Sequence, residues 1–116
     1  MTFFLPALAL VGLVPFAAAS KVGDRPYAVE IVTTVGKCEK TIAARFVVRG
    51  DDIISDRASA LIAEGAVEKN GTMWARMAKD RDLYRLQGKL KGATGSGAWS
   101  SNTRLCGGTW RGRLAQ

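Results

Sequence analysis

Apolar and polar residues alternate along much of the chain, which is the pattern of strands that bury one face. In residues 27–35 (YAVEIVTTV), Val29 and Ile31 fall on one side of an extended strand and Glu30 falls on the other. Residues 41–50 (TIAARFVVRG) repeat the pattern, and both segments are rich in β-branched residues and end in glycine-containing turn signals. We therefore expect two antiparallel strands in this region.

Residues 65–92 continue the alternation and contain a strong turn signal. Asn70-Gly71 lies between two runs that carry apolar residues, which is the strongest short signal for a β-hairpin. In residues 82–92, Tyr84 and Leu86 share one face, whereas arginine and lysine take the other. This pattern predicts strands with an apolar inner face and a basic outer face.

Residues 56–65 (DRASALIAEG) leave two interpretations open. Their alanine, leucine and glutamate content favours a short helix near residues 57–64 that ends at Gly65. The alternation of the neighbouring segments favours instead a strand through the same stretch. We keep both interpretations at this point.

The last two segments place tryptophan residues among glycines. In residues 95–99 and again in residues 106–114, the glycines and the tryptophan share one side of a strand, while Arg111 and Arg113 fall on the opposite side. Glycines leave room in a strand, so a large ring can lie over bare backbone. We interpret three aromatic residues as core, with a ligand cavity as the alternative: Tyr84, Trp99 and Trp110. A four-residue loop from Ser101 to Arg104 would pair Trp99 with Cys106, Gly97 with Gly108, and Gly95 with Trp110.

Together these segments predict an all-β fold, an antiparallel meander of about seven or eight strands. A sheet of this kind must protect its edge strands, and closing into a small barrel or half-barrel does so. We therefore expect closure like that of lipocalins or streptavidin. A two-sheet sandwich is the alternative.

The first twenty residues carry no charge and include an apolar stretch followed by Ala17-Ala18-Ala19. This is typical of a secretory signal peptide, and we expect one over residues 1–19. The apolar stretch is too short for a spanning helix, so we expect no transmembrane segment after processing. Residues 20–116 then form a single small β domain that is periplasmic or secreted.

The chain has two cysteines, Cys38 and Cys106. An even number of widely separated cysteines in an exported protein predicts a disulfide, with two buried free thiols as the alternative. On the chain-entropy estimate, closing so long a loop would stabilise the fold by roughly 4 kcal/mol.

Charge is divided unevenly along the chain. Residues 20–68 hold seven basic and eight acidic residues, whereas residues 69–116 hold ten basic residues and only Asp80 and Asp82. The C-terminal part therefore carries the whole formal charge of +7. Such an excess favours polyanionic partners.

The chain contains no histidine, which removes the commonest general base and the commonest metal ligand. We therefore predict that the protein is not an enzyme and has no cofactor. Haem would need an axial ligand from Met73, Met77, Tyr27 or Tyr84, and the two methionines fall on the core side of a predicted strand.

Seven residues project outward in the predicted register and form a basic surface with one exposed indole. This surface would suit an anionic envelope polymer or a lipid surface, whereas nucleic acid is an unlikely partner because the chain carries no nucleic-acid motif. The residues are Trp74, Arg76, Arg85, Lys89, Lys91, Arg111 and Arg113.

The segments Gly95-Ser96-Gly97-Ala98-Trp99 and Cys106 to Arg113 fit the motifs G-x-G-x-W and C-x-G-x-W-x-x-R. With the Gly36-Lys37-Cys38 turn and residues 65–71 (GAVEKNG), they give the chain a diffuse similarity to small exported bacterial proteins. Some members of this group carry labels that mention haem utilisation or adhesion. The resemblance implies secretion and an all-β fold, and it hardly bears on activity.

The leading functional hypothesis is an exported, non-enzymatic binding module that uses the basic outer face on anionic envelope components. One alternative is a small barrel that holds an apolar ligand, haem or a lipid, in a cavity lined by the three aromatic residues named above. The other is an inhibitor of an exported enzyme.

Overall fold

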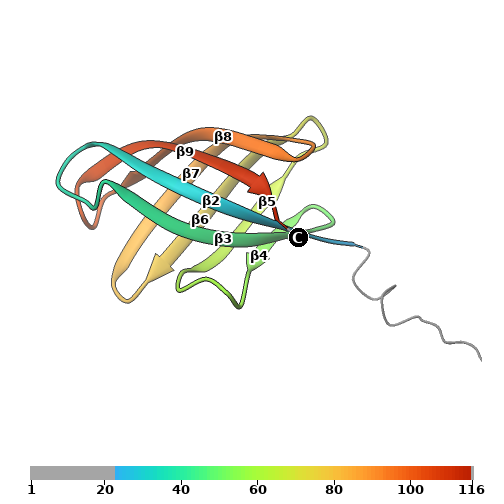
Figure 1. Cartoon of the computed structure of the whole chain (residues 1–116), viewed down its shortest axis with the longest axis horizontal. Coiled ribbons are helices and arrows are strands. Elements are labelled where there is room, and N and C mark those ends of the chain that lie inside the picture. The colour runs from blue at the N-terminus through green and yellow to red at the C-terminus, as the bar shows by residue number, and fades with distance from the viewer. Residues whose placement is uncertain (1–22, 116) are drawn as a thin grey trace, which may run out of the picture.

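The computed structural model describes residues 23–115, which form a closed barrel of eight antiparallel strands (Figure 1). Each strand pairs with the next, and the first strand pairs with the last, so the sheet has no open edge. The predicted meander barrel is confirmed, and the sandwich alternative is wrong. The expected signal peptide lies outside the described residues. The strands are β2 (Asp24–Val35), β3 (Thr41–Arg49), β4 (Asp52–Ser55), β5 (Ile62–Val67), β6 (Thr72–Lys79), β7 (Asp82–Lys91), β8 (Thr94–Ser101) and β9 (Cys106–Leu114).

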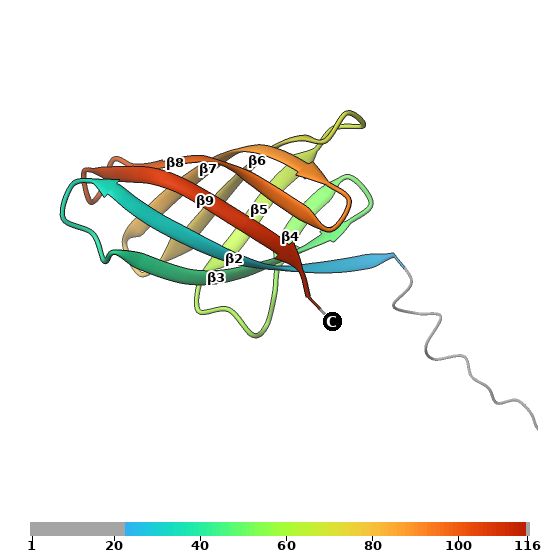
Figure 2. The ribbon, with the colours of Figure 1, turned by 45° about the horizontal axis from the view of Figure 1, so that its top comes forward.

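The closure brings the two ends of the described chain together. In both ribbon views β2 lies beside β9, and the pairing runs from Tyr27 opposite Leu114 to Val35 opposite Gly107 (Figure 2). A register shift between Thr33 and Val35 interrupts the ladder near the end of β2. The neighbours of β8 are β7 and β9, which are both long strands of the C-terminal half. The basic C-terminal segment of the sequence therefore forms one continuous part of the barrel wall.

The interior is filled by the inward-facing side chains that the alternation predicts. Val29 and Ile31 of β2, Phe46 of β3 and Leu86 of β7 are all buried. Tyr27 is also buried, and its hydroxyl donates a hydrogen bond to the backbone oxygen of Gly92 at 2.7 Å. One side chain in two along each strand therefore contributes to a single core.

The helix alternative for residues 57–64 is wrong, and the strand alternative holds only in part, because residues 57–61 form turns and β5 begins at Ile62. The backbone oxygen of Asp56 accepts a hydrogen bond from the Ser59 amide at 3.0 Å, and its carboxylate accepts one from the Ala58 amide at 2.7 Å. From Ile62 onward the backbone pairs with β6, and part of it pairs with β4 as well. Pairing with two neighbours outweighs the local preference for helix.

The predicted pairing of β8 with β9 is wrong by two residues. The turn spans residues 102–105, and Ser101 lies opposite Cys106. The Ser101 hydroxyl accepts a hydrogen bond from the Arg104 amide at 3.2 Å, and Leu105 takes a left-handed φ of 56° to complete the turn. The observed pairs are Trp99 with Gly108, Gly97 with Trp110, and Gly95 with Gly112.

This register places each buried indole against a glycine and explains why glycine is needed there. The Trp110 Nε1–H donates to the backbone oxygen of Gln87 at 3.0 Å, and a Cβ built on Gly97 would collide with that same oxygen. The pattern repeats at Gly108, where a Cβ would collide with the Val32 oxygen that accepts the Trp99 Nε1–H bond at 2.8 Å. The glycines therefore make room for the backbone acceptors that two buried indole donors require.

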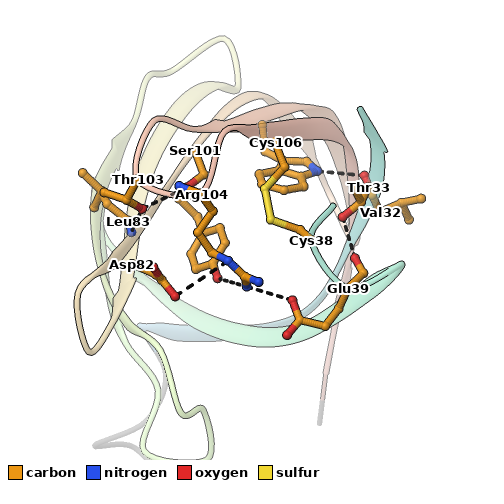
Figure 3. The surroundings of a disulfide bond; sticks show 12 residues. Val32, Thr33, Cys38, Glu39, Asp82, Leu83, Ser101, Thr103, Arg104 and Cys106 are labelled. Carbon is orange, nitrogen blue, oxygen red and sulfur yellow. Dashed lines mark hydrogen bonds and ion pairs between the residues drawn. A yellow bond between two sulfur atoms is a disulfide. The ribbon is translucent and has the colours of Figure 1, made fainter. Parts of the chain in front are cut away.

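The predicted disulfide between Cys38 and Cys106 is confirmed, and the free-thiol alternative is wrong. It joins the loop after β2 to the first residue of β9, with 6.1 Å between the two Cα atoms. The bond covers one end of the barrel (Figure 3). It therefore ties together the strands whose pairing closes the sheet.

Candidate binding groove on the outer face

An open groove with a volume of about 810 Å³ lies on the outer wall over β7, β8, β9 and β2. Its floor is β8, which presents only the short side chains of Thr94 and Ser96 here. Lysines of β7 stand on one side, and arginines of β9 stand on the other. The four cationic residues are Lys89, Lys91, Arg111 and Arg113.

Strand register fixes the arrangement of these cations. Ser96 lies opposite Lys89 on one side and Arg111 on the other, which makes one row across three strands. Thr94 lies in the same way between Lys91 and Arg113 in the next row. Since neighbouring strands are about 4.8 Å apart, the lysine and arginine backbones of each row are separated by about 10 Å. Four long cationic side chains thus surround a shallow floor.

The charges of the groove are only partly neutralised. Arg111 Nη2 lies 2.8 Å from Glu30 Oε1, and Glu30 is the one carboxylate that lines the groove. Among residues 23–115, Lys89, Lys91 and Arg113 form no ion pair. The groove therefore holds three cations whose counter-charges must come from solution or from a ligand.

A second hollow, of about 580 Å³, adjoins the groove on the side of β6 and β7. The indole of Trp74 contributes to it and is 47% exposed, and Lys89 lines both hollows. The Arg76 guanidinium lies 5.7 Å from the centre of the indole and pairs with Glu64 at 3.0 Å. Three polar side chains also line it: Glu68 from the turn after β5, Thr72 of β6 and Gln87 of β7.

The remaining residue of the expected basic surface, Arg85, lies farther along β7. It stands opposite Arg76 of β6 and Ser100 of β8, and it lines a smaller hollow of about 210 Å³. All seven residues of the expected surface are exposed, but they do not share one hollow: four of them line the groove, and Trp74 lines the second hollow together with Lys89. Arg76 is neutralised by its carboxylate partner, so it adds little to the positive potential.

Sequence reasoning missed the residues that shape the groove. Thr94 and Ser96 form its floor, and Glu30 comes from a strand at the opposite end of the sequence. In the sequence, small polar residues alternate with Gly95 and Gly97, and this alternation could have indicated a floor of short side chains. The contribution of Glu30 depends on the pairing of β2 with β9, which local patterns do not specify.

Arg104, at the disulfide end of the barrel, is by contrast well neutralised. Arg104 reaches across the end of the barrel (Figure 3), where its Nη1 donates to Glu39 Oε1 at 2.8 Å and to the Tyr84 hydroxyl at 3.2 Å. These two hydrogen bonds raise the pKa of Arg104. The backbone amide of Glu39 lowers the pKa of the Glu39 carboxyl, and Arg104 lowers it further. This cluster joins two loops and leaves little free charge for a ligand.

The basic residues of β3 are neutralised in the same way. Arg45 Nε donates to Asp56 Oδ2 at 3.1 Å. The Ala58 amide, with a smaller contribution from Arg45, lowers the pKa of Asp56. Arg49 pairs with Asp24 at 2.8 Å, and that carboxylate raises the pKa of Arg49. Basic residues of β3 therefore already have partners within the fold.

The side chains considered for an apolar ligand or haem lie in the core. Trp99 is 3% exposed and Trp110 is 0% exposed, and the Trp99 ring centre lies 5.8 Å from that of Tyr84. Tyr27, Met73 and Met77 are likewise buried among core side chains. These residues fill the barrel and contact its backbone.

Within residues 23–115, no helix has the length and apolar character that crossing a bilayer requires. In the same residues, no group of three or more aspartate, glutamate, cysteine or histidine side chains is placed to hold a metal ion. Comparison of the chain with protein-family models, with curated proteins and with solved structures gave no match.

Proposed function

We propose that the protein is an exported, non-enzymatic binding module whose outer groove holds the acidic groups of an anionic envelope polymer. The observation that carries this proposal is a set of three cations, Lys89, Lys91 and Arg113, that form no ion pair among residues 23–115 and lie around a floor of short side chains. The lysines of β7 and the arginines of β9 face each other across β8, and like charges at this separation repel each other at low salt and do not stabilise the fold. An anionic ligand would relieve that repulsion.

The shape of the groove supports a chain-like ligand. The groove lies open on the wall and has cations on two sides, so an extended polymer can lie along β8 and contact both. A polymer with many acidic groups also releases condensed counterions when it binds, which adds a favourable and salt-dependent term. The disulfide accords with an oxidising compartment such as the periplasm or the extracellular space.

The apolar-ligand hypothesis is less well supported. It requires Tyr84, Trp99 and Trp110 to line a cavity, and each of these side chains is buried in the packed core. Both indole N–H groups already bond backbone oxygens of the barrel. The residues would have to leave these contacts to admit a ligand.

Binding to long-chain inorganic polyphosphate tests the groove, because this polymer offers charge without rings. We expect binding at low salt, with the logarithm of the association constant falling linearly against the logarithm of salt concentration. The double variant Lys91→Glu/Arg113→Glu should bind about 1,000-fold more weakly, since each reversal replaces an attraction of about 1 kcal/mol with a similar repulsion and the two together cost about 4 kcal/mol.

The matched control is Lys37→Glu/Arg57→Glu, which makes the same change of net charge at exposed turns away from the groove. We expect this variant to bind within about threefold of the unmodified protein. Equal losses in the two double variants would show that net charge alone drives binding. That result, or no binding of polyphosphate by the unmodified protein at low salt, would overturn the proposal.

A further inference from the structure

We infer that the polymer is an acidic polysaccharide, with a sugar ring stacked on Trp74 and neighbouring acid groups in the cationic groove. This inference rests on the proposed function and adds the chemical class of the ligand. Two hollows of different chemistry adjoin on the same wall.

Trp74 differs from the other two tryptophans in its surroundings. The other two are buried and bond the barrel backbone, whereas 47% of Trp74 is exposed on the outer face of β6. Arg76 follows it along the strand with its guanidinium 5.7 Å from the ring centre, while Thr72 and Lys89 of the second hollow lie on the preceding side. The ring therefore has one cationic neighbour and still borders an open hollow.

The lining of this hollow suits a ring that carries hydroxyl groups. Gly88, Gly97 and Ala98 offer a floor with almost no side chains, so a flat ligand can approach the strands closely. Thr72, Gln87 and Glu68 provide hydrogen-bond donors and acceptors around it. An apolar surface with a few polar groups at its edge is the usual composition of a small-ligand site. The C–H face of a pyranose ring can pack on the electron-rich face of an indole.

Lys89 connects the two hollows. It lies opposite Thr72 of the second hollow and opposite Ser96 of the groove floor. A polymer whose ring stacks on Trp74 would thus pass Lys89 and enter the groove, where the other unpaired cations lie. A polymer in which sugar rings and acidic groups follow one another would match this order of surfaces, the indole of Trp74 first and the cationic groove next.

Two observations favour polysaccharide over single-stranded nucleic acid. Glu68 lines the hollow beside Trp74, and a carboxylate accepts hydrogen bonds from hydroxyls but repels phosphodiesters. Trp74 is also the one exposed aromatic side chain within residues 23–115, whereas grooves for single strands use several aromatic platforms for successive bases. A single aromatic platform with a carboxylate beside it therefore suits a sugar ring better than a series of nucleic-acid bases.

The test compares polygalacturonate, an acidic polysaccharide, with polyphosphate, which has charge but no rings. We expect Trp74→Ala to weaken binding of polygalacturonate about tenfold, the size of the effect when an aromatic stacking platform is removed, and to leave polyphosphate binding within twofold. Trp74→Phe should retain part of the affinity. Ile62→Ala, which removes an exposed apolar side chain of β5 outside the hollow, should behave like the unmodified protein.

Fluorescence gives an independent measurement, because Trp74 is the exposed tryptophan. Polygalacturonate should protect this emission from quenching by iodide, and polyphosphate should protect it less.

Binding of polyphosphate with no effect of Trp74→Ala on polygalacturonate would overturn the inference while the proposed groove stands. Failure of polyphosphate to bind would instead overturn the proposed function. Tighter binding of poly(dT) than of polygalacturonate, with the same dependence on Trp74, would also overturn the inference, in favour of nucleic acid.

Discussion

The two faces of β8 have opposite characters although they belong to the same eight residues. The inner face presents Gly95, Gly97 and Trp99, and its neighbours fill the remaining space with Trp110 and Leu86. The outer face presents threonine, serine and alanine between lysines of β7 and arginines of β9. The indoles of the inner face have hydrogen-bond partners within the fold, whereas three of the four cations beside the outer face form no ion pair within residues 23–115.

The difference indicates which residues serve folding and which are free for binding. Inside, each indole N–H has a backbone acceptor, and a glycine gives that acceptor its space. Outside, three cations surround a groove and form no ion pair within residues 23–115. Charges that do not stabilise a fold are candidates for ligand contacts, since their repulsion is relieved when an anion binds.

The largest difference between the two faces of the barrel wall is expected when one tryptophan on each face is replaced. Trp110→Ala removes the largest fully buried side chain and leaves the Gln87 oxygen without its indole donor. We expect a loss of about 4 kcal/mol in the free energy of unfolding, measured by urea denaturation. Trp74→Ala on the outer face should lose less than about 1 kcal/mol. Equal losses would mean that the outer tryptophan is also structural.

A second pair of substitutions separates adjacent residues of β8. A Cβ at Gly97 would collide with the Gln87 oxygen, so Gly97→Ala must move a strand and weaken the bond from Trp110. We expect a loss of about 2 kcal/mol and a changed near-ultraviolet circular dichroism signal from the buried indoles. Ser96→Ala should stay within about 0.5 kcal/mol of the unmodified protein. A neutral Gly97→Ala would show that the carbonyl can turn away without cost.

The smallest effect is expected for Lys91→Glu on the outer face. The new carboxylate would stand across Thr94 from Arg113 and replace a repulsion with an attraction. We expect stability to rise by about 0.3 kcal/mol at low salt and the gain to vanish at high salt, as measured by thermal unfolding. Lys37→Glu, at an exposed turn, provides the comparison for net charge. A clear loss of stability in Lys91→Glu would mean that the groove cations support the fold.

The sequence by itself determined the face on which most side chains lie. Period-two alternation assigned Val29, Ile31 and Phe46 to the core and Lys89 and Arg111 to the surface, because successive side chains of a strand point to opposite sides. It also determined the disulfide, because the chain has only two cysteines. The all-β meander followed from the turn signals between the alternating segments.

The tertiary structure alone decided which strands meet and in which register. Residues 57–64 could form helix or strand locally, but residues 57–61 form turns and only the segment from Ile62 onward is strand, where it pairs with β6 and, from Glu64, with β4. The two-residue shift between β8 and β9 depended on the turn made by Ser101 and Leu105. A shift by two keeps every side chain on its face but changes its neighbours, so alternation cannot detect it. The row from Lys89 through Ser96 and Arg111 to Glu30 arises from such long-range pairing, and the groove with it.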